Sequence, residues 1–265
     1  MKIRDLISKY VSNGCSFRVA KNLTAEEILL TRISSSSLVE HVTLKGGIVM
    51  YNLTKNVRRA TVDVDLDLIH YSIGKDSIKA FVELLNKGSD FSYLIDGDIL
   101  DLHQEDYHGI RINLLISDDT DSLSIKIDIG VHTYLAMEQE KLIFTFDASH
   151  ESISLLANSP EQIFCEKMFS LARLGRASTR YKDIFDMYYL LSKKSVDMIK
   201  VREYVKLFLT QSKREPHDLC SLQNVVEDTL KDKRFKKVAS KPYNKWLDDE
   251  YDLIASTIID FINRL

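Results

Sequence analysis

Three aspartates stand at alternate positions in the stretch TVDVDLDLIH, residues 61–70. A β-strand places every second side chain on the same face, so Asp63, Asp65 and Asp67 would share one face and the aliphatic residues between them the other. Carboxylates this close repel one another unless a cation lies between them, and carboxylate oxygens are ligands that Mg²⁺ prefers. The pattern therefore predicts a strand with one buried face and one cation-binding face.

A fourth aspartate, Asp128, has a similar setting in SIKIDIGV, where it alternates with isoleucines. If the two strands are neighbours, Asp63, Asp65 and Asp128 could meet around two divalent ions. Such ions activate an attacking hydroxyl and stabilise a leaving pyrophosphate. We expect these three aspartates to form the metal set, and Asp67 to be a surface or supporting charge. A solvated polar face of a half-exposed sheet explains the aspartates about as well when they are considered alone.

Two adjacent glycines, Gly46 and Gly47, follow the apolar run VTL and precede IVMYNL. This order places them where a strand turns into a helix. Without side chains they allow backbone N–H groups to approach an anion at the positive end of that helix, which suits a phosphate. A tight turn is the simpler interpretation of a Gly-Gly pair taken by itself.

The composition is that of a soluble globular protein, with 265 residues, 45% hydrophobic and 28% charged residues and a net charge of −3. Any nucleic-acid binding would therefore depend on local basic clusters. Cys15, Cys165 and Cys220 are too widely spaced to indicate a zinc site or a disulfide framework. The N-terminus lacks the apolar core of a signal peptide, and no apolar run approaches the roughly 20 residues of a membrane span. We expect a cytoplasmic protein that does not enter a membrane.

The elements that would position these residues predict a mixed α+β fold in three parts. Residues 1–40 are expected to form a helical lead-in in which Thr24 caps a helix. Residues 41–150 would form a core with a small mixed sheet, and residues 151–265 a helical domain whose first helix opens at Pro160. The core strands are expected at 42–44, 62–69, 109–117, 123–131 and 142–146, and its helix at 76–88.

Taken in order, the segments LKGG, RRATVDVDLDL, KIDIG and EKMFSLARLGRASTRYKDIFDMYYL resemble the AbiEii/AbiGii toxin family, a branch of the DNA polymerase β-like nucleotidyltransferase superfamily. The similarity runs from about residue 20 to 191. It implies a polymerase β-like core followed by a helical bundle, and a nucleotidyltransferase that acts as the toxin of a toxin–antitoxin or abortive-infection system. It also implies a nucleoside triphosphate donor, Mg²⁺ and a protein antitoxin. Related MenT-type toxins add nucleotides to the 3′ end of tRNA, so tRNA is the expected acceptor.

The resemblance also implies which residues act. The family's motifs fall on Gly46 and Gly47 for the glycine turn, Arg59 and Thr61 for the lead-in to the strand, Asp63 and Asp65 for the metal pair, Asp128 for the third carboxylate, Lys167 for the helical lysine, and Lys182, Asp183 and Asp186 for the K-D-x-x-D segment. Asp65 and Asp67 also form a D-x-D pair. We prefer the first pair because the lead-in residues then keep their offsets.

Three of the helical residues can also be interpreted from spacing alone. Lys167 lies at the border of an apolar stripe, where its ammonium could reach a triphosphate, unless it is an ordinary surface lysine. Asp183 and Asp186 share a helix face and could orient Lys167 or Lys182, or act as a base for the acceptor hydroxyl. A surface ion pair between Lys182 and Asp186 is the alternative.

The segment KDKRFKKVASKPYNKW, residues 231–246, mixes lysines and an arginine with Phe235, Tyr243 and Trp246. Basic groups would neutralise phosphates and aromatic rings could stack on unpaired bases, although charged helix surfaces in many proteins look similar. The sequence leaves two other functions open. One is a nucleotidyltransferase that modifies a small molecule or a protein, and the other is a binding relative without catalytic activity.

Overall fold

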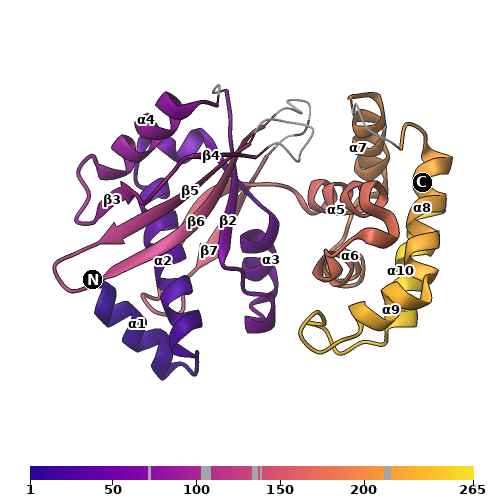
Figure 1. Cartoon of the computed structure of the whole chain (residues 1–265), viewed down its shortest axis with the longest axis horizontal. Coiled ribbons are helices and arrows are strands. Elements are labelled where there is room, and N and C mark those ends of the chain that lie inside the picture. Colours follow the sequence, from indigo (N-terminus) through magenta and orange to yellow (C-terminus); the bar gives the residue numbers. More distant parts are fainter. Residues whose placement is uncertain (71–72, 103–108, 133–136, 138, 212–215) are drawn as a thin grey trace. The chain divides into compact units, whose positions relative to one another are not determined.

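The chain folds into two compact units, Met1–Asn158 and Ser159–Leu265, in the computed structural model shown in Figure 1. The first unit contains a sheet with helices, and the second is helical. This agrees with the predicted α+β class, a mixed sheet followed by helices. The structure describes residues 1–70, 73–102, 109–132, 137, 139–211 and 216–265.

The described strands of the first unit form one mixed sheet in the order β3-β5-β6-β2-β1-β8-β7, with β4 paired to β5. β2 runs parallel to β6 and β1 runs parallel to β8, whereas the other neighbours are antiparallel. The strands are β1 Val42–Lys45, β2 Asp63–Leu68, β3 Ser92–Ile95, β4 Leu100–Leu102, β5 Gly109–Ser117, β6 Ser122–Val131, β7 Glu140–Thr145 and β8 Ser152–Ala157.

Alternation along the strands separates a buried face from a polar face. In β6, Ile125, Ile127 and Ile129 are buried, whereas Lys126 and Asp128 are partly exposed. Each buried aliphatic side chain contributes roughly 1.5–3 kcal/mol, and a one-residue slip would exchange the two faces. The apolar residues therefore fix which way the charged side chains point, as the sequence predicted.

Four helices of the described part of the first unit pack on or beside this sheet. α2 contacts β6 and β8, α3 contacts β1 and β2, and α4 contacts β3. The N-terminal residues are therefore part of the same unit as the sheet rather than a separate lead-in. The helices are α1 Ile3–Ser12, α2 Phe17–Ser34, α3 Gly46–Thr54 and α4 Lys75–Asn86.

The cap predicted at Thr24 is wrong. α2 begins earlier, because the Ser16 hydroxyl accepts a hydrogen bond from the Val19 N–H and so caps the helix there. Thr24 is fully buried in the middle of α2. A threonine followed by two glutamates resembles a helix start, but the apolar positions on both sides of it continue one helical stripe.

Three strands were not expected from the sequence: β3, β4 and β8. β3 and β4 span four and three residues, which is too short for alternation to stand out. β8 pairs with the preceding strand β7 in a hairpin and with β1, which is distant in the sequence, so its place in the sheet depends on a long-range pairing. As a result, the helical unit begins at Ser159 and not at residue 151.

The second unit is built from helices α5 to α10. α5 opens as predicted, with the Ser159 hydroxyl accepting from the Gln162 N–H and Pro160 in the first turn, and it ends at Gly175. α5 packs against α6, α7 and α8, and α10 packs against α6 and α8. None of the described helices in either unit combines the length and apolar character that a bilayer crossing needs. The helices are α5 Pro160–Leu174, α6 Tyr181–Lys193, α7 Met198–Gln211, α8 Leu219–Lys231, α9 Lys233–Ala239 and α10 Tyr251–Ile262.

Candidate active site

The pairing of β2 with β6 brings the three predicted carboxylates together. In this parallel pair Asp65 lies directly opposite Asp128, and Asp63 lies opposite Lys126. Because residues two apart on a strand share a face, Asp63, Asp65 and Asp128 lie on the same polar face of the sheet. The two strands are neighbours in the middle of the sheet although about 60 residues separate them in the sequence.

Two cations contact this carboxylate face. Arg111, on β5, donates from Nε and Nη2 to the two carboxylate oxygens of Asp128, each at 2.6 Å. The Lys126 ammonium lies 2.6 Å from Asp63 Oδ1. The hydrogen bond with Asp128 raises the pKa of Arg111, and the charges of Asp63 and Asp65 add to that effect. One guanidinium therefore interacts with all three carboxylates.

Arg111 was not among the site residues predicted from the sequence. It stands at an outward position of β5, directly opposite Asp128 in the antiparallel pair with β6. The alternation in GIRINLLIS signals its face, because Ile110 and Ile112 on either side of it are buried. What the sequence lacks is the pairing register that brings this arginine to Asp128.

The glycine turn lies directly against this carboxylate face. Gly46 has φ +63°, and a Cβ atom at this position would lie 2.4 Å from Asp65 Oδ2. A Cβ on Gly47 would lie 2.9 Å from the Thr61 Cβ. The Thr61 hydroxyl in turn accepts from the Asp63 N–H at 3.3 Å. Only glycine permits these approaches, and the first turn of α3 presents its N–H groups beside the acidic side chains.

Asp67 differs from the other aspartates of β2. It is 5% exposed, and its Oδ1 lies 2.6 Å from the ammonium of Lys45, the residue before the glycine turn. Of the two roles expected for Asp67, the surface charge is wrong, since Asp67 belongs to a buried ion pair, and the supporting charge stays a prediction. This pairing explains the third aspartate of the strand without a metal, and it favours Asp63 and Asp65 as the D-x-D pair.

A second cluster lies in the helical unit. The Lys167 ammonium, on α5, lies 2.6 Å from Asp183 Oδ1 and 2.8 Å from Asp186 Oδ2, both on α6. Lys167 is 8% exposed and Asp186 is fully buried, so neither a surface lysine nor a surface pair of Lys182 with Asp186 describes them. The two acids orient Lys167, one of the roles the sequence suggested. Nucleotide or catalytic roles for Lys167, Lys182, Asp183 and Asp186 stay predictions.

Comparison with known proteins identifies the family. Residues 28–250 match the family model of the nucleotidyl transferase AbiEii toxin of type IV toxin–antitoxin systems. The chain belongs to this family. It is a nucleotidyltransferase of a toxin family, and the family implies an antitoxin as a partner. No curated protein matches the chain.

Two crystal structures from Helicobacter pylori are similar to this AbiEii-family protein. One is JHP933, with 13% identity, a TM-score of 0.49, and coverage of 95% of this chain and 93% of that one. The other is described as a "putative nucleotidyltransferase", with 13% identity, a TM-score of 0.50, and coverage of 94% and 95%. At this identity the second likeness shows the fold alone.

The carboxylate face of this AbiEii-family protein suits a divalent cation in its donor chemistry. Hard oxygen ligands come from three aspartates on adjacent strands, Asp63, Asp65 and Asp128. They lie beside a turn whose two glycines have no side chains to fill the space. Within the described residues no three His, Cys, Asp or Glu side chains already surround a common point at metal-ligand distance. Asp63 and Asp128 instead contact Lys126 and Arg111. The residues fit the cation, and they would hold it in place of these two partners.

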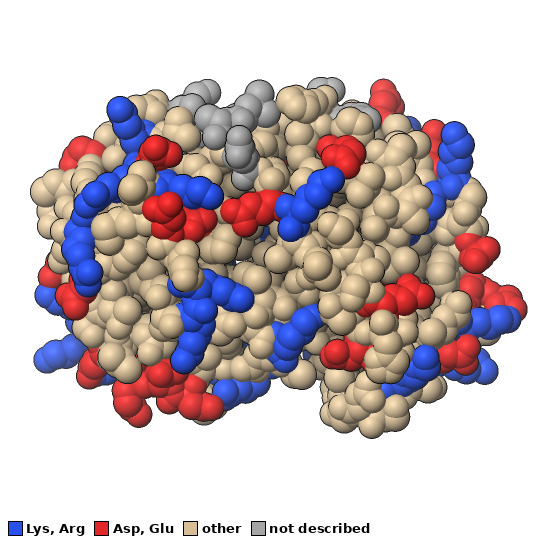
Figure 2. Space-filling view, turned by 180° about the vertical axis from the view of Figure 1, so that it is seen from behind, with Lys and Arg blue, Asp and Glu red and all other residues tan. Residues whose placement is uncertain are grey.

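The basic segment at residues 231–246 is less suited to base stacking than predicted. Phe235 and Trp246 are buried, so of the three aromatic residues only Tyr243 exposes its ring. Lys231 and Lys236 form ion pairs with Glu227 and Asp252. On the face of the molecule in Figure 2, basic and acidic side chains are intermingled. The exposed basic residues of the segment include Lys233, Arg234, Lys237 and Lys241.

Proposed function

We propose that this AbiEii-family enzyme transfers a nucleotide from a nucleoside triphosphate to an RNA acceptor, the 3′ end of tRNA, in a magnesium-dependent reaction. The observation that carries the proposal is the meeting of Asp65 with Asp128 across two strands, with Gly46 packed against Asp65. The close approach of Asp65 requires glycine at position 46 whatever the site binds, so the glycine alone does not decide the function. What supports the proposal is that the N-terminus of α3, which favours a bound phosphate, lies beside carboxylates that can hold a divalent cation.

The residues divide the work of binding and transfer. The N–H groups in the first turn of α3 would receive the triphosphate, since a helix N-terminus favours anions. The acceptor hydroxyl would attack the α-phosphorus, the bond to the β-phosphate oxygen would break, and pyrophosphate would leave with the hydroxyl proton passing to solvent. Magnesium held by Asp63, Asp65 and Asp128 would neutralise the phosphate charge and favour ionisation of the acceptor hydroxyl.

Arg111 and Lys126 would support the same step. In the absence of substrate they balance part of the negative charge of the three aspartates. Both cations are about one-third exposed, so water screens their ion pairs and the pairs are weak. They can therefore move from a carboxylate to a phosphate oxygen, which arginine binds well. Exposed Lys233, Arg234 and Lys237 offer further positive charge for an RNA acceptor.

A transfer assay tests this proposal. The protein is incubated with each of the four triphosphates labelled at the α-phosphate, and with purified total tRNA, tRNA-depleted RNA or a protein extract as acceptor. We expect label on tRNA, its loss when the divalent ion is chelated, and its return with added Mg²⁺. Asp65→Asn should lower the transfer rate at least about a hundredfold, whereas Asp76→Asn, on an exposed turn of α4, should not change it.

Two outcomes would contradict the proposal. Label found only on protein or on small molecules would exclude the tRNA acceptor and favour the other substrate classes. Unchanged transfer by Asp65→Asn would exclude the carboxylate face as the site. Both variants should first be shown to be folded by circular dichroism and thermal melting.

A further inference from the structure

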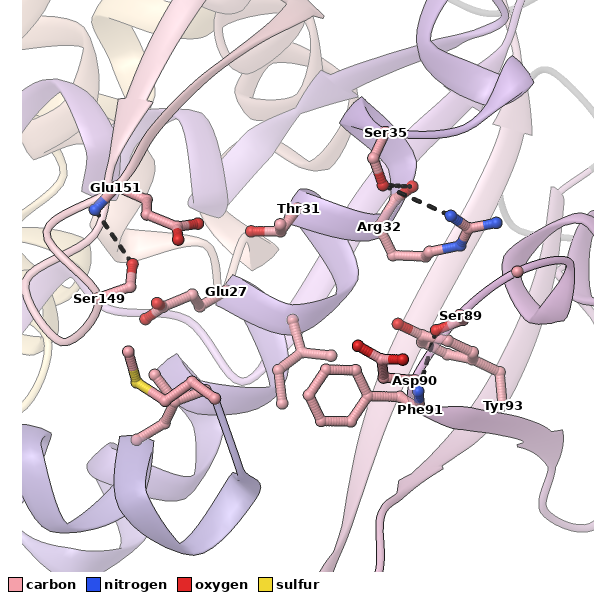
Figure 3. Close-up of a pocket in the computed structure, with 14 residues that line it drawn as sticks. Glu27, Thr31, Arg32, Ser35, Ser89, Asp90, Phe91, Tyr93, Ser149 and Glu151 are labelled. Carbon is pink, nitrogen blue, oxygen red and sulfur yellow. Dashed lines mark hydrogen bonds between the residues drawn. The ribbon is translucent and has the colours of Figure 1, made fainter.

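A cavity of about 240 Å³ lies in the first unit, bordered by α1, α2, the segment between α4 and β3, and the turn between β7 and β8. Figure 3 shows its lining. Its wall contains neither the glycine turn nor any of the three aspartates of the carboxylate face. Ligand sites in proteins are typically concave and combine an apolar wall with a few polar groups. The polar groups of this cavity indicate what it would bind.

One end of the cavity carries two glutamates, Glu27 and Glu151. Glu27 is 3% exposed, and it accepts a hydrogen bond from the Tyr10 hydroxyl at 2.7 Å. Burial raises the pKa of Glu27, hydrogen bonds from Ser149 and Tyr10 partly offset this rise, and the charge of Glu151 adds to it. Neither glutamate forms an ion pair with a lysine or arginine of the described residues. In Figure 3 they flank Ser149 at the same end of the cavity. This end therefore favours a bound cation.

The other end presents a buried hydroxyl. Tyr93 is fully buried, and its hydroxyl oxygen makes no hydrogen bond of acceptable geometry with a described residue, although Ser89 is near. Burial raises the pKa of Tyr93 to about 12, so the hydroxyl keeps its proton. Figure 3 shows Tyr93 beside Asp90. A buried hydroxyl without a partner costs free energy, and a ligand group could satisfy it.

Arg32 also lines this end, and its positive charge reaches the Tyr93 hydroxyl. Its guanidinium donates hydrogen bonds to three backbone carbonyl oxygens at the C-terminal end of α4 and to the Ser35 hydroxyl. The guanidinium is thereby fixed to the end of the helix. Its role is to hold α4 against α2 and so to shape the cavity wall.

Apolar side chains also contribute to the cavity wall. Leu6, Ile28 and Phe91 are among the residues that line the cavity. A ligand that spans it needs a positive group at the glutamate end, an apolar stem, and a hydrogen-bonding group at the Tyr93 end. The ring of Phe91 can also interact favourably with a nearby ammonium.

We propose that this cavity binds a small aliphatic amine with a second polar group at its far end, such as a short diamine. Its ammonium would contact Glu27 and Glu151, its methylene stem would pack on Ile28 and Phe91, and its far group would meet the Tyr93 hydroxyl. The same chemistry is found in the lysine side chain of a protein. The test therefore includes both sources.

Isothermal titration of the full chain tests the proposal with four probes: 1,4-diaminobutane, n-butylamine, 1-butanol and Nα-acetyl-lysine methylamide. We expect diaminobutane to bind about tenfold more tightly than butylamine, as one added hydrogen bond would give, and butanol not to bind. Glu27→Gln should weaken diaminobutane binding at least about tenfold. Glu83→Gln, an exposed glutamate of α4, should leave it unchanged. Tyr93→Phe should remove the preference for diaminobutane.

Three results would overturn the proposal. The first is butanol binding as tightly as butylamine, and the second is full diaminobutane binding by a folded Glu27→Gln variant. If that variant does not fold, Glu151→Gln, at an exposed position, gives the same comparison. The third is tighter binding of Nα-acetyl-lysine methylamide than of diaminobutane, which would assign the cavity to a protein lysine instead of a free amine.

Discussion

Two clusters of carboxylates and cations in this protein are chemically alike but differ in burial. On the carboxylate face of β2 and β6, the side chains of Asp63 and Asp128 are 29% and 20% exposed beside Lys126 and Arg111. In the helical unit, Asp186 is fully buried against Lys167. The difference is that water reaches the two cations of the first cluster, about one-third exposed, far more than it reaches Lys167 at 9%.

This difference separates charges that can exchange partners from charges that cannot. A screened pair contributes about 0–1 kcal/mol, so a substrate or a metal ion can replace one partner at small cost. A buried pair is different, because removing one partner leaves a charge without water or counter-ion. We therefore interpret the carboxylate face as the region where chemistry occurs, and the Lys167 cluster as a fixed part of the helical unit.

The largest effect is expected where the buried cluster is broken. Lys167→Met should lower the free energy of unfolding by about 3–5 kcal/mol, because Asp186 and Asp183 would lose their cation. Urea unfolding followed by circular dichroism measures this loss. Lys193→Met, at an exposed position of α6, is the matched control and should change stability by less than about 0.5 kcal/mol. If Lys167→Met lowered the free energy of unfolding by less than about 1 kcal/mol, the buried cluster would be no stronger than the exposed ion pairs of the carboxylate face.

A smaller effect is expected at the glycine turn. Gly46→Ala would place a Cβ atom 2.4 Å from Asp65 Oδ2, so the carboxylate must move. A displacement of about 1 Å at a reacting centre can lower the rate about a hundredfold. Gly88→Ala is the control, since Gly88 also has a positive φ, +74°, but open space around its Cβ position. Both variants carry backbone strain of about 1–3 kcal/mol, and only Gly46→Ala should impair transfer. Equal transfer rates in the two variants would show that the glycine turn is not part of the active site.

The smallest effect on stability is expected on the carboxylate face itself. Arg111→Met and Lys126→Met should each change the free energy of unfolding by no more than about 1 kcal/mol, because both ion pairs are partly exposed. The same urea unfolding experiment applies. A loss of about 3 kcal/mol or more would show that these cations are structural, like Lys167, and cannot be exchanged for a substrate.

The sequence predicted best what depends on local periodicity. Alternation identified β2 and β6 and the faces of Asp63, Asp65 and Asp128, since the buried aliphatic residues determine those faces. The glycine turn was also predicted, because a Gly-Gly pair between an apolar strand and an amphipathic run marks the point where the chain reverses closely against its neighbours. For these features the local pattern and the final fold require the same conformation.

What depends on contacts between distant segments could not be predicted from periodicity. The position of Asp128 beside Asp65, and of Arg111 beside Asp128, comes from strand pairings that no local pattern encodes. The burial of Asp67 depends on Lys45 on the neighbouring strand, and an aspartate in an alternating run is ordinarily solvent-facing. The burial of Lys167 could not be predicted for the same reason, because its two acidic partners lie on another helix.

The most direct test of the central claim compares Asp63→Asn with Asp67→Asn, two residues on the same face of one strand. Transfer of labelled nucleotide is measured per folded molecule, with unfolding curves for both variants. We predict that Asp63→Asn loses at least about a hundredfold in rate at nearly unchanged stability. Asp67→Asn should lose about 3 kcal/mol of stability by breaking its buried pair with Lys45, with a rate within about tenfold of the wild type. The reverse pattern, with transfer abolished by Asp67→Asn and retained by Asp63→Asn, would exclude Asp63 from the active site.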